Sequence, residues 1–97
     1  MGQPQPQQER QLAEARREVE TRKARVFRND GKGNHTQLRV EPKESSTFVL
    51  GSVLFNGIIV DILDEEELYQ GWEYVRFSPN QDTDIRGWVR KIYLQYQ

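Results

Sequence analysis

The sequence contains no cysteine and a single histidine, His35. Without cysteine the chain can form no disulfide and no thiolate metal site, and it has no cysteine nucleophile. His35 follows a stretch rich in glycine and asparagine with no second histidine beside it, which argues against a metal ligand or a general base. A glycine-rich phosphate loop and a Ser/His/acid set are also missing. We therefore expect no cofactor, no bound metal and no enzymatic activity.

Long apolar runs are missing as well. None approaches the roughly 18 residues that a membrane helix needs, so no membrane span is predicted. The start of the chain, Gln3-Pro4-Gln5-Pro6-Gln7-Gln8, lacks the apolar core of a signal peptide. The compartment stays open: a complete chain would be cytoplasmic, whereas a fragment of a larger exported protein would belong to the cell envelope or the extracellular space.

Apolar residues are scarce at the start of the chain and dense later, above all in residues 48–63. A chain of 97 residues allows one small core. Residues 1–8 are rich in Gln and Pro and are expected to be disordered. Residues 9–23 are dominated by Glu, Arg, Ala and Gln without Gly or Pro, which predicts a charged helix. Its apolar stripe is one residue wide, so this helix either packs lightly on the rest of the chain or belongs to a coiled coil.

From residue 24 onward, short apolar segments alternate with turn residues. Asn56-Gly57 stands between two apolar runs, as in a hairpin turn. After it, alternation turns Val60 and Ile62 to the inside. Residues 78–84 are expected to form a loop with its turn at Pro79-Asn80. Five or six short strands at this spacing predict an all-β protein, a closed or partly open small barrel with an N-terminal helical extension.

Six segments follow one another in the order of a known family. They are Leu38-Arg39-Val40-Glu41-Pro42, Val49-Leu50-Gly51-Ser52-Val53-Leu54, Gly57-x-x-Val60-x-Ile62-Leu63, Gly71-Trp72-x-x-Val75, Gly87-Trp88-Val89 and Tyr93-Leu94. As a set they resemble the bacterial-type SH3 (SH3b) domain, and the resemblance covers residues 24–97. It implies a small SH3-like barrel. Members of that family commonly accompany peptidoglycan hydrolases and bind cell-wall peptide or glycan, while others are intracellular protein-binding modules.

The aromatic residues supply the candidate binding site, because a barrel of this size cannot bury all of them. Alternation along the segment 72–77 puts Trp72 and Tyr74 on the face opposite Val75. Exposed Trp and Tyr are typical binding anchors. The candidate ligand-binding aromatics are Trp72, Tyr74, Tyr93 and Tyr69. The alternative is that Trp72 and Tyr74 only cover the end of the barrel or pack against the helix. Trp88, between two small inward positions, is expected to be structural.

Charge is distributed unevenly along the chain, although its sum is only −1. Residues 9–28 hold seven Lys/Arg and four Glu, whereas residues 29–97 hold seven Lys/Arg and eleven Asp/Glu. Part of the acidic excess is a cluster that includes Glu65, Glu66 and Glu67. Such a cluster is either a solvated loop or an acidic rim that selects basic side chains of a partner.

The sequence thus predicts a non-catalytic binding module that recognises a peptide or protein partner, preferably basic, through an aromatic groove with an acidic rim. Two alternatives stay open. One is a cell-wall (peptidoglycan) targeting module of a larger exported protein. The other is nucleic-acid binding through the basic helix, which the negative balance of residues 29–97 disfavours.

Overall fold

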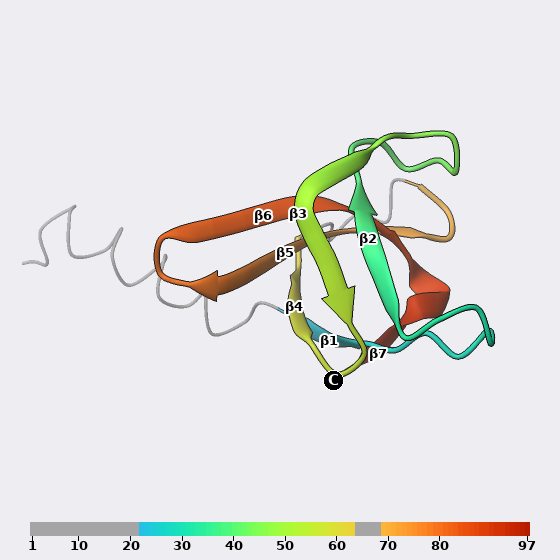
Figure 1. Cartoon of the computed structure of the whole chain (residues 1–97), viewed down its shortest axis with the longest axis horizontal. Coiled ribbons are helices and arrows are strands. Elements are labelled where there is room, and N and C mark those ends of the chain that lie inside the picture. Colours follow the sequence, from blue (N-terminus) through green and yellow to red (C-terminus); the bar gives the residue numbers. More distant parts are fainter. Residues whose placement is uncertain (1–21, 64–68) are drawn as a thin grey trace, which may run out of the picture.

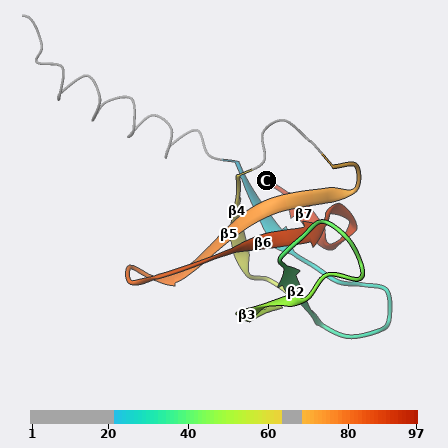
Figure 2. The same cartoon turned by 90° about the horizontal axis from the view of Figure 1, so that it is seen from above.

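Figures 1 and 2 show a computed structural model of the chain, which describes residues 22–63 and 69–97. The tail expected at residues 1–8, the helix expected over 9–23 apart from its last two residues, and the acidic residues Glu65–Glu67 lie outside the described part.

The described chain is built of short β-strands. They are β1 (Lys23–Val26), β2 (His35–Arg39), β3 (Phe48–Phe55), β4 (Ile59–Ile62), β5 (Trp72–Asn80), β6 (Thr83–Arg90) and β7 (Leu94–Tyr96), with one 3₁₀ turn, η1 (Lys91–Tyr93), before the last strand. The all-β prediction is confirmed for residues 22–63 and 69–97. Within these residues, no helix is long and apolar enough to cross a membrane.

The seven strands form one antiparallel sheet in the order β3-β2-β6-β5-β4-β1-β7. The sheet curls around the core (Figures 1 and 2), but the end strands β3 and β7 are not paired with each other, so it is not a closed barrel. The sequence predicted five or six strands, but the structure has seven among the described residues, and the additional one is β7. This three-residue strand follows η1 directly and pairs with β1 through contacts such as Val26 with Leu94, which the local sequence does not reveal.

The loop expected at residues 78–84 is shorter than predicted. Strand β5 continues to Asn80 and β6 begins at Thr83, and these two residues face each other across the hairpin. Pro79 is accommodated because the register shifts between Phe77 and Asn80, as is usual for a proline at a bulge. The β5–β6 hairpin consequently forms a long arm that projects from the rest of the sheet (Figure 1).

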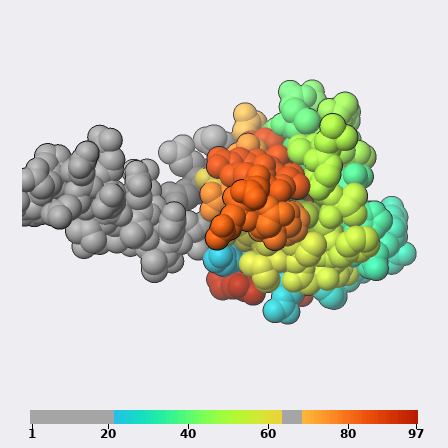
Figure 3. Space-filling model, turned by 60° about the vertical axis from the view of Figure 1, so that its left-hand side comes forward, coloured from blue at the N-terminus to red at the C-terminus, as the bar shows by residue number. Residues whose placement is uncertain are grey.

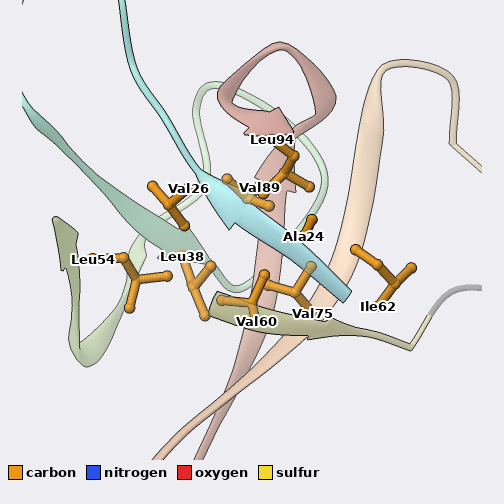
Figure 4. Packing of buried hydrophobic residues seen from close by; sticks show 9 residues of the cluster. All are labelled: Ala24, Val26, Leu38, Leu54, Val60, Ile62, Val75, Val89 and Leu94. Atoms are coloured by element: carbon orange, nitrogen blue, oxygen red, sulfur yellow. The ribbon is translucent and has the colours of Figure 1, made fainter. Parts of the chain in front are cut away.

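The core is made of small and medium aliphatic side chains (Figure 4). Its buried members are Ala24, Val26, Leu38, Leu54, Val60, Ile62, Val75, Val89 and Leu94. Val60 and Ile62 point inward, as their alternation predicts. None of the nine is aromatic, and Phe48 and Phe55 are about half exposed. The core is therefore closed by aliphatic side chains, and both phenylalanines lie outside it.

One charged side chain lies among these aliphatic residues. Glu73 alternates with Trp72 and Tyr74 and therefore faces inward, where its exposure is 2%. Its Oε1 accepts a hydrogen bond of 3.0 Å from the Tyr96 hydroxyl and lies 3.8 Å from Nζ of Lys91. Its Oε2 has no hydrogen-bond partner within the described residues. Such a group is costly to bury, so its remaining contacts matter for stability.

Gly87 marks the place where β6 passes closest to β2. A Cβ atom at this position would lie 2.7 Å from Cβ of Leu38 and 3.0 Å from both the carbonyl oxygen of Arg39 and Cγ2 of Val49. These distances are well below the roughly 3.5–4.0 Å of a normal carbon contact. Glycine therefore permits the close packing that sets Trp88, the next residue, beside β2.

Strand β3 forms one edge of the sheet and carries no charged residue over its eight positions. Several of its apolar side chains face solvent, and Leu50 is 95% exposed. The opposite edge, β7, has three residues. The two edges are therefore very different in length and character.

Candidate functional site

The candidate site lies on the outer side of β5 and β6. Glu73 and Val75 face inward, so the residues that alternate with them, Trp72 and Tyr74, face outward. Cross-strand pairing matches Trp72 with Arg90 and Tyr74 with Trp88. The outer side of this hairpin therefore presents aromatic and arginine side chains together. In Figure 3 the hairpin (orange to red) stands beside β3 (green to yellow) on one face of the molecule.

Three aromatic rings on this side contact one another. The ring of Trp88 lies 5.1 Å from that of Tyr74 and 5.0 Å from that of Tyr69, measured between centroids, and Tyr69 meets it edge to face. Such geometries are favourable for aromatic pairs. The rings stay partly accessible, and Tyr69 is 48% exposed. Together with Trp72, these residues define what we call the aromatic face: Tyr69, Trp72, Tyr74 and Trp88.

A pocket of about 130 Å³ opens beside Trp72. Its walls include aromatic side chains, Trp72, Phe48 and Tyr93, and three guanidinium groups, which belong to Arg28, Arg39 and Arg90. We call this cavity the arginine pocket. It is assembled from β2, β3, β5, β6, η1 and the segment after β1. Trp72 is shared between the pocket and the aromatic face, so the two features are continuous.

The carboxylate of Glu44, in the loop between β2 and β3, also lines the pocket. It lies 3.4 Å from Nη2 of Arg39 and is paired with Nη2 of Arg90. Arg39 is held further by hydrogen bonds from Nη1 to the carbonyl oxygens of Glu44 (2.7 Å) and Ser46 (3.0 Å), and its guanidinium lies over the ring of Phe48. Arg39 is thus fixed in place by its own loop.

Arg90 is less completely satisfied. Its guanidinium carbon lies 5.4 Å from the centroid of Trp72, a cation–π contact. Its Nε is buried and has no hydrogen-bond partner within residues 22–63 and 69–97. One donor of this pocket-lining side chain therefore remains unused.

Arg28 is oriented by Asp30 and Tyr93. Its Nε donates to both carboxylate oxygens of Asp30 at 3.1 Å, and its guanidinium carbon lies 4.9 Å from the Tyr93 ring centroid. The Tyr93 hydroxyl donates to Oδ2 of Asp30 at 3.3 Å. The hydrogen bond from Arg28 holds the pKa of the Asp30 carboxyl below its ordinary value, and the backbone N–H of Lys32 lowers it further. At this end of the pocket, Arg28, Asp30 and Tyr93 thus hold one another in place.

The predicted site residues fall into two groups. Trp72 and Tyr93 meet at the arginine pocket, whereas Tyr74 and Tyr69 meet at Trp88. The residues of the predicted acidic rim, Glu65, Glu66 and Glu67, lie outside the described part.

Sequence reasoning did not place Trp88 or the arginines at this site. Trp88 was expected to be structural; it is half-buried, and its buried neighbours Gly87 and Val89 place it and Arg90 on the outer side of β6. That signal was available in the sequence. No local sequence pattern predicts that Glu44, in the loop between β2 and β3, lines the pocket.

The site combines aromatic rings with charged side chains. Within residues 22–63 and 69–97, no group of three or more His, Asp or Glu is placed to hold a metal ion. The side chains offer ring faces, guanidinium donors and one loop carboxylate. No protein-family model, curated protein or solved structure matches this chain.

Proposed function

We propose that this chain is a non-catalytic, SH3-like binding module that recognises a segment of a protein partner on its aromatic face. The SH3-like assignment is supported by the family resemblance of residues 24–97 and by a curled antiparallel sheet of short strands. One observation carries this proposal: the core is aliphatic, and the Trp and Tyr side chains of β5 and β6 lie half-buried on the outer side of the hairpin. Rings that pack on each other there form a stiff contact surface at low entropic cost.

The aromatic face continues into the arginine pocket through Trp72, so a bound segment would contact rings and guanidinium groups in succession. Selection of basic side chains by Glu65–Glu67 stays a prediction, since these residues lie outside the described part.

Nucleic-acid binding is the second candidate, because arginines interleaved with aromatic residues are typical of single-strand binding surfaces. Arg76 and Arg86 follow Tyr74 and Trp88 along the same side of the hairpin. However, Arg76 pairs with Asp61 at 2.9 Å and Arg86 with Asp84 at 3.0 Å. These carboxylates offset the positive charge that a phosphate backbone requires, so we rank protein binding first.

The test is to recover ligands from a displayed peptide library and to measure their affinity for Trp72→Ala. We expect a loss of about 2 kcal/mol or more, the size typical of a hot-spot aromatic. Phe55→Ala is the matched control, since Phe55 is an exposed aromatic at the end of β3 whose ring packs on His35. Circular dichroism and thermal unfolding verify that each variant is folded, and Tyr74→Ala replaces Trp72→Ala if the latter unfolds. Equal affinities of the face variant and the Phe55→Ala control would refute the assignment.

A further inference from the structure

The arginine pocket has more positive than negative charge. Three guanidinium groups, those of Arg28, Arg39 and Arg90, face it, and two carboxylates, Glu44 and Asp30, pair with them. Asp30 is engaged by Arg28 through two hydrogen bonds and by Tyr93 through a third. Glu44 is therefore the carboxylate that pairs with both Arg39 and Arg90.

Glu44 is exposed in this role. Its side chain is 58% exposed, comes from a loop, and pairs with Arg90 and, at 3.4 Å, with Arg39. Ion pairs this exposed contribute little to stability, so an incoming group can displace Glu44 at small cost. The position of its carboxylate shows where an anionic group is accommodated between the two arginines.

Arg90 supplies the second observation. Glu44 pairs with its Nη2, while its Nε–H has no hydrogen-bond partner among the described residues. A buried donor without an acceptor is costly. A carboxylate that reaches Nε as well as Nη2 would form the two parallel hydrogen bonds that guanidinium groups favour. The ring of Trp72 already fixes the orientation of this guanidinium.

The pocket also has the room. Its volume of about 130 Å³ is several times the roughly 10–15 Å³ that a single water requires. Trp72 and Tyr93 are among the residues that line it, and would lie beside the methylene groups of a bound short side chain.

From these observations we infer that the arginine pocket binds the carboxylate of an Asp or Glu side chain of the partner segment, and that Glu44 occupies this position until the ligand displaces it. The inference rests on the proposed binding function and specifies its ligand as an acidic peptide. This polarity at the pocket is opposite to the basic preference expected from Glu65–Glu67. The binding step is an exchange of one carboxylate for another, and no covalent chemistry is involved.

The test uses the full chain and blocked eight-residue peptides that are identical except for carrying Glu, Gln or Lys at four positions. Binding is followed by NMR at fixed ionic strength, through the arginine Nε–H signals and the indole signals. We expect the Glu peptide to shift the Arg90 and Trp72 signals in a saturable manner and to bind about tenfold more tightly than the Gln peptide, as suits charge-assisted hydrogen bonds.

Single substitutions measure how much each pocket residue contributes to binding of the Glu peptide. Arg90→Gln should weaken binding of the Glu peptide about tenfold, and Arg90→Lys, which keeps the charge but loses the planar donor pair, should weaken it by an intermediate factor. Glu44→Gln should strengthen binding about threefold, because the internal competitor is gone. Arg86→Gln is the matched control: Arg86 lies on the same strand but pairs with Asp84, outside the pocket. It should leave the affinity unchanged.

Three results would overturn the inference: equal binding of the Glu and Gln peptides, an equal loss in Arg86→Gln and Arg90→Gln, or an unchanged affinity in Glu44→Gln. A thymidine oligonucleotide of equal length that shifts the same Arg90 signal at lower concentration would identify phosphate, and not a peptide, as the occupant. The two proposals fail separately. If library ligands still depend on Trp72 while the Glu preference is missing, only the acidic ligand is wrong; if Trp72→Ala binds them normally, the binding face itself is wrong.

Discussion

Gly87→Ala should destabilise the protein by about 2–3 kcal/mol, the upper part of the range for overpacked positions. The added methyl group would lie 2.7 Å from Cβ of Leu38 and 3.0 Å from the carbonyl oxygen of Arg39. Both atoms are part of β2 or attached directly to its backbone, so no side-chain rotation can relieve the contact. The third close atom, Cγ2 of Val49 at 3.0 Å, belongs to a side chain and can move. Strands β2 and β6 must therefore separate locally.

Urea and thermal unfolding of the parent and of Gly87→Ala measure the effect. In a domain of this size each kcal/mol corresponds to roughly 4–8 °C in Tm. Adding Val49→Ala should restore little of the loss, because the two backbone-linked contacts persist. Gly31→Asn is the control. Gly31 has a φ of 78° and nothing within 4 Å of an added Cβ, and asparagine tolerates that conformation. A Tm of Gly87→Ala equal to that of the parent, or full rescue by Val49→Ala, would refute the close-approach argument.

Three further predictions concern polar contacts. Tyr96→Phe removes a 3.0 Å hydrogen bond to the buried carboxylate of Glu73 and should cost about 1–3 kcal/mol in urea unfolding; an unchanged stability would mean that water already serves this carboxylate. Asn56→Ala removes hydrogen bonds to the backbone N–H and carbonyl of Arg28, at 2.8 and 3.2 Å, and should cost about 1–2 kcal/mol by the same measurement. In Arg28→Gln, the pKa of Asp30 should rise toward its ordinary value in a carbon-detected NMR titration. Because the folded-state pKa of Asp30 in the parent is lowered, its contribution to stability is present above the unfolded-state pKa and is lost as the pH falls through the folded value; a titration of Asp30 that is identical in parent and variant would contradict the assigned hydrogen bond.

Alternation within single strands was the part of the structure that could be predicted from the sequence. It placed Val60 and Ile62 inside, and it turned Trp72 and Tyr74 to the face opposite Val75. This works because successive side chains in a strand point to opposite faces whatever the strand pairs with.

The arginine pocket could not be predicted in this way. It unites Arg28, Arg39, Trp72, Arg90 and Tyr93, and their proximity depends on strand order and register, which tertiary packing decides. The composition of the core was equally out of reach, because which apolar side chains it buries depends on how the sheet curls, and here it buries only aliphatic ones.

The uncharged edge strand β3 has a consequence for the behaviour of this protein in concentrated solution. An edge strand leaves a row of backbone N–H and C=O groups without a neighbour, and proteins usually guard such an edge with charged residues, proline or short length. Residues Phe48–Phe55 contain no charge and no proline, and their one irregularity is the register shift against β2 around Gly51; a net charge of −1 supplies little repulsion between molecules. We therefore expect this strand to promote association at high concentration, and a lysine introduced at a solvent-facing position such as Val53 to raise solubility without altering the core.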